Sequence, residues 1–220
     1  MKKVGVVLAG CGVYDGSEIH EAVLTLLYLD QAGAEIHCFA PDKEQMHVVN
    51  HLTGQPVDGE KRNVLTESAR IARGEIKPLS EMKLNQLDAV VFPGGFGAAK
   101  NLCTFAVDGA GCDIDPDVLG VIGEALVQKK AIGAICISPV VVARALKDSD
   151  ENPEMTIGQD QATNEALTAL KAKPVNAGVA EIVVDQKHKI VTTPAYMLGP
   201  RISNVAAGIE ALVKKIIEIA

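Results

Sequence analysis

Short apolar runs alternate with longer amphipathic segments along this chain. The apolar runs predict buried strands, and the segments with helical periodicity predict helices. We expect strands at 4–9, 35–40, 89–92, 131–135, 182–184 and 189–192. We expect helices near 17–31, 64–73, 116–129, 139–146, 164–171 and 201–219. Strands that alternate with helices indicate an α/β protein whose mostly parallel sheet is covered on both faces.

Three segments refine this pattern. Residues 185–188 lie between two alternating segments and predict a hairpin turn, so one edge of the sheet should be antiparallel. Residues 42–62 are polar and rich in turn formers, which indicates a lid or a dimer contact. The apolar stretch 205–220 should pack on the sheet. We expect residues 1–220 to form a single domain.

Composition excludes several classes of protein. The net charge of −7 and the aromatic content of 3% argue against a nucleic-acid surface, which would show clustered Lys and Arg. No apolar run approaches the roughly 18 residues of a membrane span, so we expect no membrane partner. The five cysteines form no C-x-x-C pair, which argues against a zinc knuckle or a disulfide framework. A reducing cytoplasm is therefore the expected location.

Cys136 is the first candidate for chemistry. It ends the apolar run 131–135, and Ser138 and Pro139 follow as a typical N-cap and first helical residue. A strand, a cysteine and a helix in this order predict a nucleophile elbow. The unpaired N–H groups at the helix start should favour the thiolate. The alternative is a buried structural cysteine.

Two further segments should meet Cys136 at the carboxyl ends of the strands. Gly94 and Gly95 follow the strand 89–92, and their N–H groups suit an oxyanion or a phosphate, unless they only form a tight turn. Glu21 belongs to a polar stripe on an otherwise apolar helix, so it points either into the site or along a solvent-facing strip. Glu18 stabilises the helix start and needs no catalytic role, and His20 should lie on the surface.

The hydroxyl groups in segment 191–196 give a weaker signal for a pocket wall. No dinucleotide fingerprint and no P-loop is present, because Gly94 and Gly95 have neither the G-x-G-x-x-G spacing nor a following Gly-Lys-Ser/Thr. We therefore expect no cofactor and no metal.

These motifs together resemble the PfpI superfamily, which includes the class I glutamine amidotransferase domains. Within it the chain is most similar to the ElbB-type enhancing-lycopene-biosynthesis proteins, also described as isoprenoid biosynthesis proteins with an amidotransferase-like domain. The resemblance implies a flavodoxin-like three-layer sandwich. The residues that carry it span the chain and are Gly10–Glu21, Asn50–Gly54, Arg62–Leu65, Pro93–Asn101 and Thr192–Leu198.

The resemblance also implies roles for individual residues. Cys136 occupies the nucleophile position, and Glu21 matches the glutamate that hydrogen-bonds the thiol. Gly95 and Ile137 would offer backbone N–H groups to an oxyanion, with Gly94 shaping the turn. The implied activity is a slow, glutathione-independent glyoxalase that converts glyoxal, a small aldehyde, to glycolate through a hemithioacetal on Cys136. A homodimer is also implied.

One departure from the family limits the chemistry. Amidotransferases and PfpI-type proteases need a histidine beside the cysteine, but Ile137 follows Cys136 here. The only later histidine, His188, is expected in an exposed turn. We therefore expect neither amidotransferase nor protease activity. The alternative to the glyoxalase is a redox-sensing or regulatory cysteine protein linked to isoprenoid metabolism, without significant catalysis.

Overall fold

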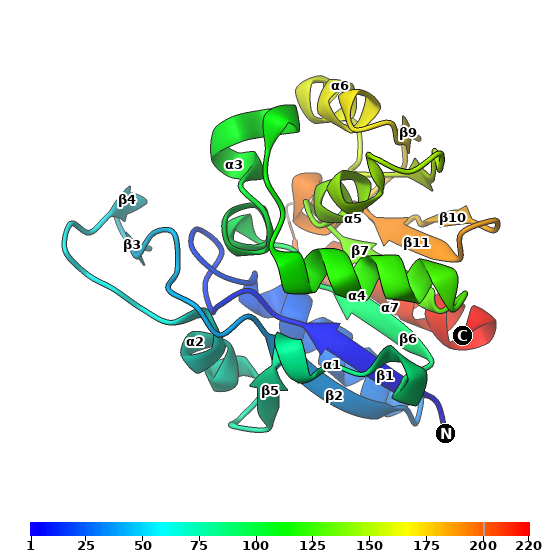
Figure 1. Ribbon diagram of the computed structural model, residues 1–220, viewed down its shortest axis with the longest axis horizontal. Coiled ribbons are helices and arrows are strands. Elements are labelled where there is room, and N and C mark those ends of the chain that lie inside the picture. Colours follow the sequence, from blue (N-terminus) through cyan, green and yellow to red (C-terminus); the bar gives the residue numbers. More distant parts are fainter. Residues whose placement is uncertain (200) are drawn as a thin grey trace.

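A seven-stranded sheet forms the centre of the computed structural model, which describes residues 1–199 and 201–220. All neighbouring strands are parallel except the hairpin at one edge, where β10 and β11 are antiparallel (Figure 1). The predicted hairpin at residues 185–188 is thereby confirmed. The strand order across the sheet is β10 (Val183–Asp185), β11 (Ile190–Thr193), β7 (Ala131–Ile135), β6 (Ala89–Phe92), β1 (Lys3–Val7), β2 (Glu35–Ala40) and β5 (Ile76–Pro78).

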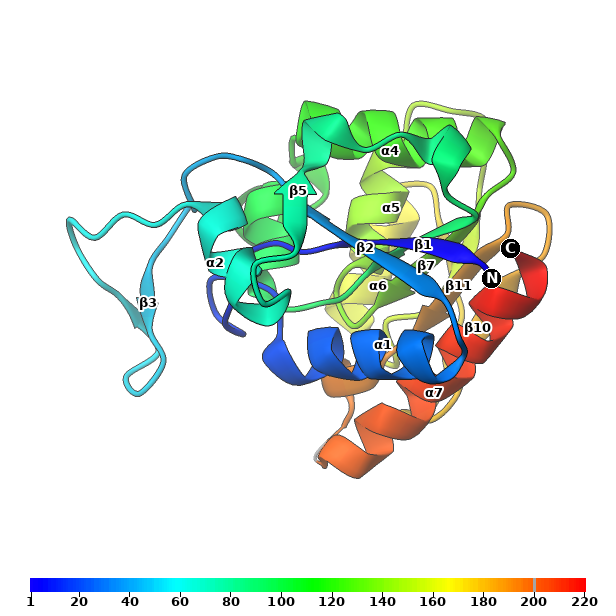
Figure 2. The ribbon, with the colours of Figure 1, turned by 90° about the horizontal axis from the view of Figure 1, so that it is seen from below.

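Helices cover both faces of this sheet. Figure 2 shows α4 (Pro116–Val127) and α5 (Pro139–Leu146) on one face, with α1 (Ile19–Gln31) and α7 (Ile202–Ile219) on the other. Each face has its own buried cluster of aliphatic side chains, because the strands are apolar on both sides. The predicted flavodoxin-like three-layer sandwich is confirmed, and α7 packs on the sheet as expected.

Several short elements had no signal in the hydrophobic pattern. Elements this short give a weak periodic signal, and sequence patterning missed six of them. They are β3 (Val49–Asn50), β4 (Gln55–Pro56), β5, α3 (Phe105–Asp108), β8 (Glu154–Met155) and β9 (Lys173–Pro174). The remaining helices, α2 (Val64–Ile71) and α6 (Gln161–Ala169), lie close to their predicted positions.

Strands β3 and β4 form an arm that extends away from the sheet (Figure 1). Leu52 at its tip is 98% exposed. The arm lies within the segment 42–62 for which we expect a lid or a dimer contact, and that role stays a prediction. In the described part of the chain, no helix has both the length and the apolar character needed to cross a bilayer.

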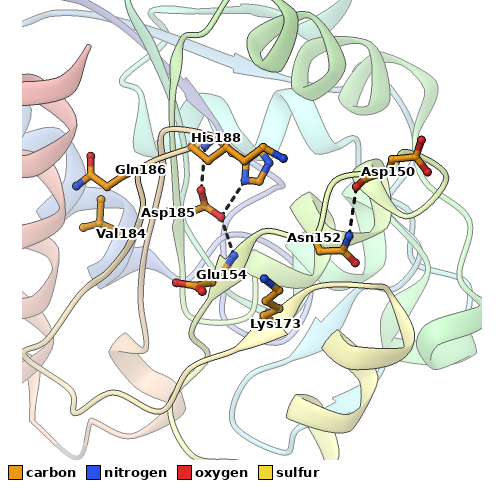
Figure 3. Close-up of a pocket in the computed structure, with 9 residues that line it drawn as sticks. Asp150, Asn152, Glu154, Lys173, Val184, Asp185, Gln186 and His188 are labelled. Atoms are coloured by element: carbon orange, nitrogen blue, oxygen red, sulfur yellow. Dashed lines mark hydrogen bonds and ion pairs between the residues drawn. The ribbon is translucent and has the colours of Figure 1, made fainter.

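The prediction of an exposed His188 is wrong: in the turn between β10 and β11, Gln186 and Lys187 are exposed but His188 is buried. His188 is 7% exposed and its Nε2 lies 2.5 Å from Oε2 of Glu151. Its backbone N–H donates to Oδ1 of Asp185 at 2.9 Å, and Asp185 also accepts the N–H of Glu154 at 2.8 Å (Figure 3). Nδ1 of His188 lies 2.8 Å from Oδ2 of Asp185, an ion-pair contact without hydrogen-bond alignment. The imidazole of His188 is therefore held between the carboxyl groups of Glu151 and Asp185.

Candidate functional site

Cys136 lies in a strained turn between β7 and α5. Its φ is +61°, in the left-handed region that residues with a side chain rarely adopt. Its N–H donates to the carbonyl of Thr193 at 2.9 Å, and the N–H of Ser138 donates to the carbonyl of Ile135 at 3.0 Å. Such strain at a strand-to-helix turn is typical of a nucleophile elbow. The elbow predicted from the sequence is confirmed as a backbone geometry.

Ser138 has a different role from the one predicted. It occupies the N-cap position of α5, but its side chain caps no N–H group of the helix. Its hydroxyl instead donates to the carbonyl of Pro93 at 2.7 Å. This bond ties the elbow to the loop after β6.

The loop after β6 places two glycines against the cysteine. A Cβ atom on Gly94 would lie 2.5 Å from Cβ of Cys136 and 2.6 Å from Oε2 of Glu21, so only glycine fits there. Gly95 has a φ of +99°, which also favours glycine. The N–H groups of Gly95 and Ile137 both lower the pKa of the Cys136 thiol, which places both donors beside its sulfur. Two donors therefore converge where an oxyanion would form next to the sulfur.

Glu21 points into the site and is fully buried. Its Oε2 accepts the N–H of Gly94 at 3.0 Å, and its Oε1 accepts the N–H of Tyr196 at 3.2 Å. Its carboxyl group also hydrogen-bonds the thiol of Cys136. The structure thus decides between the two orientations that the polar stripe left open, and it brings Glu21, Gly94, Gly95, Cys136 and Ile137 together.

Glu18 begins the helix that carries Glu21. Its Oε2 accepts the N–H of Glu21 at 2.7 Å, and its own N–H donates to the carbonyl of Gly94 at 2.9 Å. Ser17, where the helix was predicted to begin, instead accepts the N–H of Ala9 through its hydroxyl at 2.9 Å. Glu18 is therefore the helix cap, and it fixes Glu21 against the loop after β6.

Burial controls the protonation of this pair. Burial, with the negative charge of Glu18, raises the pKa of Glu21 to about 8, against the opposing N–H groups of Tyr196 and Gly94. Burial, with the negative charge of Glu21, also raises the pKa of the Cys136 thiol, although the N–H groups of Gly95 and Ile137 lower it. The prediction that the helix start favours a thiolate is therefore wrong, because desolvation outweighs the helix dipole. At neutral pH the pair holds both protons.

Replacing Glu21 with Gln tests this protonation state through stability. An ordinary glutamate pKa is 4.5, so between pH 4.5 and about 8 the folded protein holds a proton that the unfolded chain has lost. The contribution of Glu21 to stability is fully present below pH 4.5 and is lost as the pH rises to about 8. The loss is about 1.4 kcal/mol per pH unit and totals roughly 5 kcal/mol. Gln does not titrate, so the variant lacks this slope.

The measurement is urea unfolding of wild type and Glu21→Gln at pH 5.5 and pH 8.5. At pH 5.5 the variant should be less stable, because its NH₂ group faces an N–H donor of Gly94 or Tyr196. At pH 8.5 the difference should shrink or reverse. Parallel stability curves for the two proteins would contradict a buried, protonated Glu21.

Cys136 reaches a cavity of about 570 Å³ at the carboxyl edge of the sheet. The sulfur-bearing residue is only 7% exposed, so the cavity is the route by which a small molecule meets it. Most of the lining is apolar, and Glu18 and Asp160 supply the acidic groups. The lining residues are Val13, Glu18, Gly95, Phe96, Ala99, Phe105, Ala106, Cys136, Ile137, Asp160, Thr163, Tyr196 and Met197.

The segment 191–196 contributes less than its hydroxyl groups indicated. Thr192 accepts the N–H of Thr156 at 2.9 Å and Thr193 donates to the carbonyl of Glu181 at 2.9 Å, so both hydroxyls serve the fold. Tyr196 does line the cavity, and its hydroxyl lies 2.8 Å from Nδ1 of His20. His20 is exposed as expected, but sequence reasoning missed its contact with a cavity residue.

Phe105, on α3, is another cavity residue that sequence reasoning missed. The four-residue helix that carries it has no periodic signal, and its position against the cavity depends on how the loop folds back. No sequence pattern was available to find it.

No family model matches the chain. A protein named ES1 protein homolog, mitochondrial, from Rattus norvegicus is 50% identical over 99% of this chain and 84% of its own length. The human glutamine amidotransferase-like class 1 domain-containing protein 3, mitochondrial, is 49% identical over 99% of this chain and 83% of its own length. This chain belongs to the ES1, or glutamine amidotransferase-like class 1, family.

Solved structures of other proteins share the fold of this chain. An isoprenoid biosynthesis protein with an amidotransferase-like domain from Ehrlichia chaffeensis is 38% identical, with a TM-score of 0.93 over 100% of this chain and 99% of that one. DJ-1beta from Drosophila melanogaster has a TM-score of 0.56 at 19% identity over 100% of this chain and 95% of that one, which shows a shared fold alone. The predicted similarity to class I glutamine amidotransferase-like proteins and to isoprenoid biosynthesis proteins with an amidotransferase-like domain is confirmed.

The relatives correct one expectation. The ES1-family proteins from rat, human and zebrafish are all named as mitochondrial. These names contradict the cytoplasmic location expected from the cysteines, because scattered free cysteines indicate only a reducing compartment and do not say which one.

Proposed function

We propose that this family member is a low-turnover, glutathione-independent glyoxalase that converts glyoxal to glycolate. One observation carries the proposal: a buried thiol opens on a cavity while two backbone N–H groups and a carboxyl group contact its sulfur. Thiol, oxyanion donors and a proton-carrying acid are the parts that addition to an aldehyde requires. The substrate class, a small aldehyde, and the homodimer remain predictions from the resemblance.

The reaction begins with addition of the sulfur of Cys136 to one carbonyl carbon of glyoxal. A C–S bond forms, and the carbonyl oxygen, hydrogen-bonded by the N–H groups of Gly95 and Ile137, takes a proton through Glu21. The hemithioacetal C–H proton then moves to the neighbouring carbonyl carbon, and the hemithioacetal O–H proton moves to the neighbouring carbonyl oxygen. These two transfers convert the hemithioacetal to a thioester. Water cleaves the thioester and releases glycolate with the free thiol. The net change is glyoxal plus water to glycolate plus a proton, so no external oxidant or reductant takes part.

The electrostatics of the pair support slow turnover. Addition needs a sulfur without its proton and a carboxyl group that keeps one, which is the singly protonated form of the Cys136–Glu21 pair. Because burial raises both pKa values, this form is scarce at neutral pH. We therefore expect the Cys136–Glu21 pair to turn over slowly at neutral pH.

Amide hydrolysis is a poorer fit to this site. Of the residues that the structure describes, no histidine lines the cavity around Cys136. His188 precedes β11 at the amino edge of the sheet, whereas Cys136 follows β7 at the carboxyl edge. With β7 and β11 parallel, the two residues are on the order of 20 Å apart. His188 therefore cannot pass a proton between Cys136 and a leaving amine.

Oxidation of Cys136 as its main role is also not favoured. A redox-sensing cysteine is accessible and has a low pKa. Cys136 is 7% exposed and its pKa is raised by burial. Neither condition for the alternative function holds at this residue.

The test is glycolate formation from glyoxal without glutathione, measured between pH 6 and pH 9. We expect kcat/KM to rise with pH through about 8, because the pair loses its first proton there. Protein heated until it unfolds serves as the control for hydrolysis catalysed by exposed thiols. A rate equal to that control at every pH would refute the proposed activity.

A further inference from the structure

The cavity at Cys136 is much larger than glyoxal. Its volume of about 570 Å³ lies within the range of sites that hold drug-sized ligands, roughly 300–1,000 Å³. Glyoxal is only a few times larger than a water molecule, which takes up about 30 Å³ in the liquid. Glyoxal therefore fills a small part of the cavity, and the rest has room for the side group of a larger aldehyde.

Most of the cavity wall is apolar. Two aromatic rings contribute to it, Phe96 from the loop after β6 and Phe105 from α3, together with Val13 and Met197. Phe96 is 49% exposed and Phe105 is half-buried, so both rings keep surface that a ligand can cover. Covering such surface with an apolar group is favourable. The wall therefore suits an apolar tail.

The charged side chains that line the cavity are both acidic, and both are helix caps. Glu18 caps α1 by accepting the N–H of Glu21 at 2.7 Å, and Asp160 caps α6 by accepting the N–H of Thr163 at 2.8 Å. The positive ends of these two helices therefore meet carboxylates of the protein itself. Of the residues that the structure describes, no lysine, arginine or histidine lines the cavity.

The other polar groups near the cavity already have partners. The hydroxyl of Thr163 donates to Oδ1 of Asp160 at 2.6 Å, and the hydroxyl of Tyr196 lies 2.8 Å from Nδ1 of His20. Lys100 is not a lining residue, and its Nζ donates to a backbone carbonyl at 2.8 Å. The donors left for a ligand are the two backbone N–H groups beside the sulfur. They suit the aldehyde end of a substrate and not its tail.

We propose that this cavity selects 2-oxoaldehydes with an uncharged, apolar tail and discriminates against those whose tail carries a negative charge. The aldehyde carbon meets the sulfur, and the tail lies against Phe96 and Phe105. An anionic tail loses water without gaining a cation, and Glu18 and Asp160 repel it. The proposal rests on the proposed function: the proton transfers given for glyoxal convert a 2-oxoaldehyde and water to a 2-hydroxy acid.

Turnover of two arylglyoxals tests the preference. Phenylglyoxal and para-carboxyphenylglyoxal share their reacting carbons and differ by one carboxylate on the ring, and their products are mandelate and para-carboxymandelate. We expect kcat/KM to be about tenfold or more higher for phenylglyoxal, because the carboxylate must approach two acidic groups. Equal values, or a higher value for the carboxylate, would overturn the proposal.

Alkylation of Cys136 tests the same preference without turnover. In each case the sulfur displaces iodide and forms a C–S bond, and the reagents are iodoacetamide, its N-benzyl derivative and iodoacetate. Tryptic peptide 131–144 carries Cys136 as its only cysteine, so mass spectrometry gives the rate at that residue. Each rate is divided by the rate of the same thiol in urea-unfolded protein. The N-benzyl reagent should then be fastest and iodoacetate slowest, about tenfold apart. Three equal ratios would contradict the selectivity.

Variants that remove one charge locate the discrimination. Glu18→Gln should raise the rate of iodoacetate relative to iodoacetamide several-fold, because Glu18 is only 9% exposed and poorly screened by salt. Asp160→Asn keeps a helix cap at an exposed position, so its effect should be smaller, about twofold. The matched control is Asp117→Asn, which removes an exposed carboxylate in the first turn of α4, outside the cavity, and should leave the ratio unchanged. An equal shift in Asp117→Asn and Glu18→Gln would assign the effect to net charge and refute the proposal.

The selectivity and the glyoxalase activity fail in different ways. If no aldehyde is converted while the three alkylation rates keep the expected order, the glyoxalase proposal fails and the selectivity of the cavity stands. If glyoxal is converted while the alkylation rates show no order, the selectivity fails and the glyoxalase proposal stands. Alkylation of the wild-type protein decides this, so the result holds even if a variant does not fold.

Discussion

Replacing Cys136 with Ser should abolish glycolate formation from glyoxal. A serine hydroxyl keeps its proton at neutral pH and is a far weaker nucleophile than sulfur, while its volume suits the same buried turn. We expect kcat/KM to fall roughly 10³-fold or more, by analogy with removal of other enzyme nucleophiles. The measurement is glycolate production at pH 8, with circular dichroism to verify that the variant is folded.

Cys38→Ala is the matched control for this substitution. Cys38 is a buried cysteine on β2, outside the cavity that Cys136 lines. Its loss should leave the rate of glycolate formation unchanged. If Cys136→Ser retained the wild-type rate, or if Cys38→Ala lost it, Cys136 would not be the nucleophile.

Substituting Gly94 with Ala should damage both activity and stability. The added Cβ would lie 2.5 Å from Cβ of Cys136, 2.6 Å from Oε2 of Glu21 and 2.8 Å from the carbonyl oxygen of Ile135. Two of these atoms are held by backbone, so the loop or the elbow must shift. We expect a loss of about 3 kcal/mol or more in the free energy of unfolding, the upper range for overpacking. Because Cys136 and Glu21 would be displaced from each other, the variant should also lose most of the rate of glycolate formation.

Gly120→Ala provides the matched control. Gly120 lies inside α4, is exposed, and has no atom within 4 Å of a Cβ placed on it. The same substitution there should raise stability by up to about 1 kcal/mol, because alanine favours a helix interior. Urea unfolding and the glycolate assay measure both variants. Equal stability and equal activity in the Gly94→Ala variant and wild type would show that the close approach is not required.

The two substitutions examine different properties of one site. Cys136→Ser removes the reacting atom and leaves the backbone in place, whereas Gly94→Ala leaves every reacting group and moves them apart. The free energy that holds the site together comes from backbone contacts between the end of β6, the start of α1 and the elbow. Those contacts also bury the acid and the thiol, which is why both pKa values are raised. The contacts that position Cys136 and Glu21 therefore also make both groups harder to ionise.

Much of the fold follows from the hydrophobic pattern. The runs that became β1, β2, β6, β7 and β11 are apolar because both sheet faces are covered, so their signal is strong. Cys136 was found because a buried strand ended abruptly in Cys-Ile-Ser-Pro, and Gly94 because paired glycines followed another strand. Other short elements, such as β8 and α3, carried no such signal.

By itself, the sequence determined which segments are strands and helices and which cysteine ends a strand, since these depend on local periodicity and turn chemistry. Only the tertiary structure decided that Glu21 turns inward and that His188 is buried between two carboxyl groups. It also reversed the expected ionisation of Cys136. The physical reason is the same in each case: desolvation and contacts between distant segments depend on which atoms surround a group, and neighbours in the chain do not specify them.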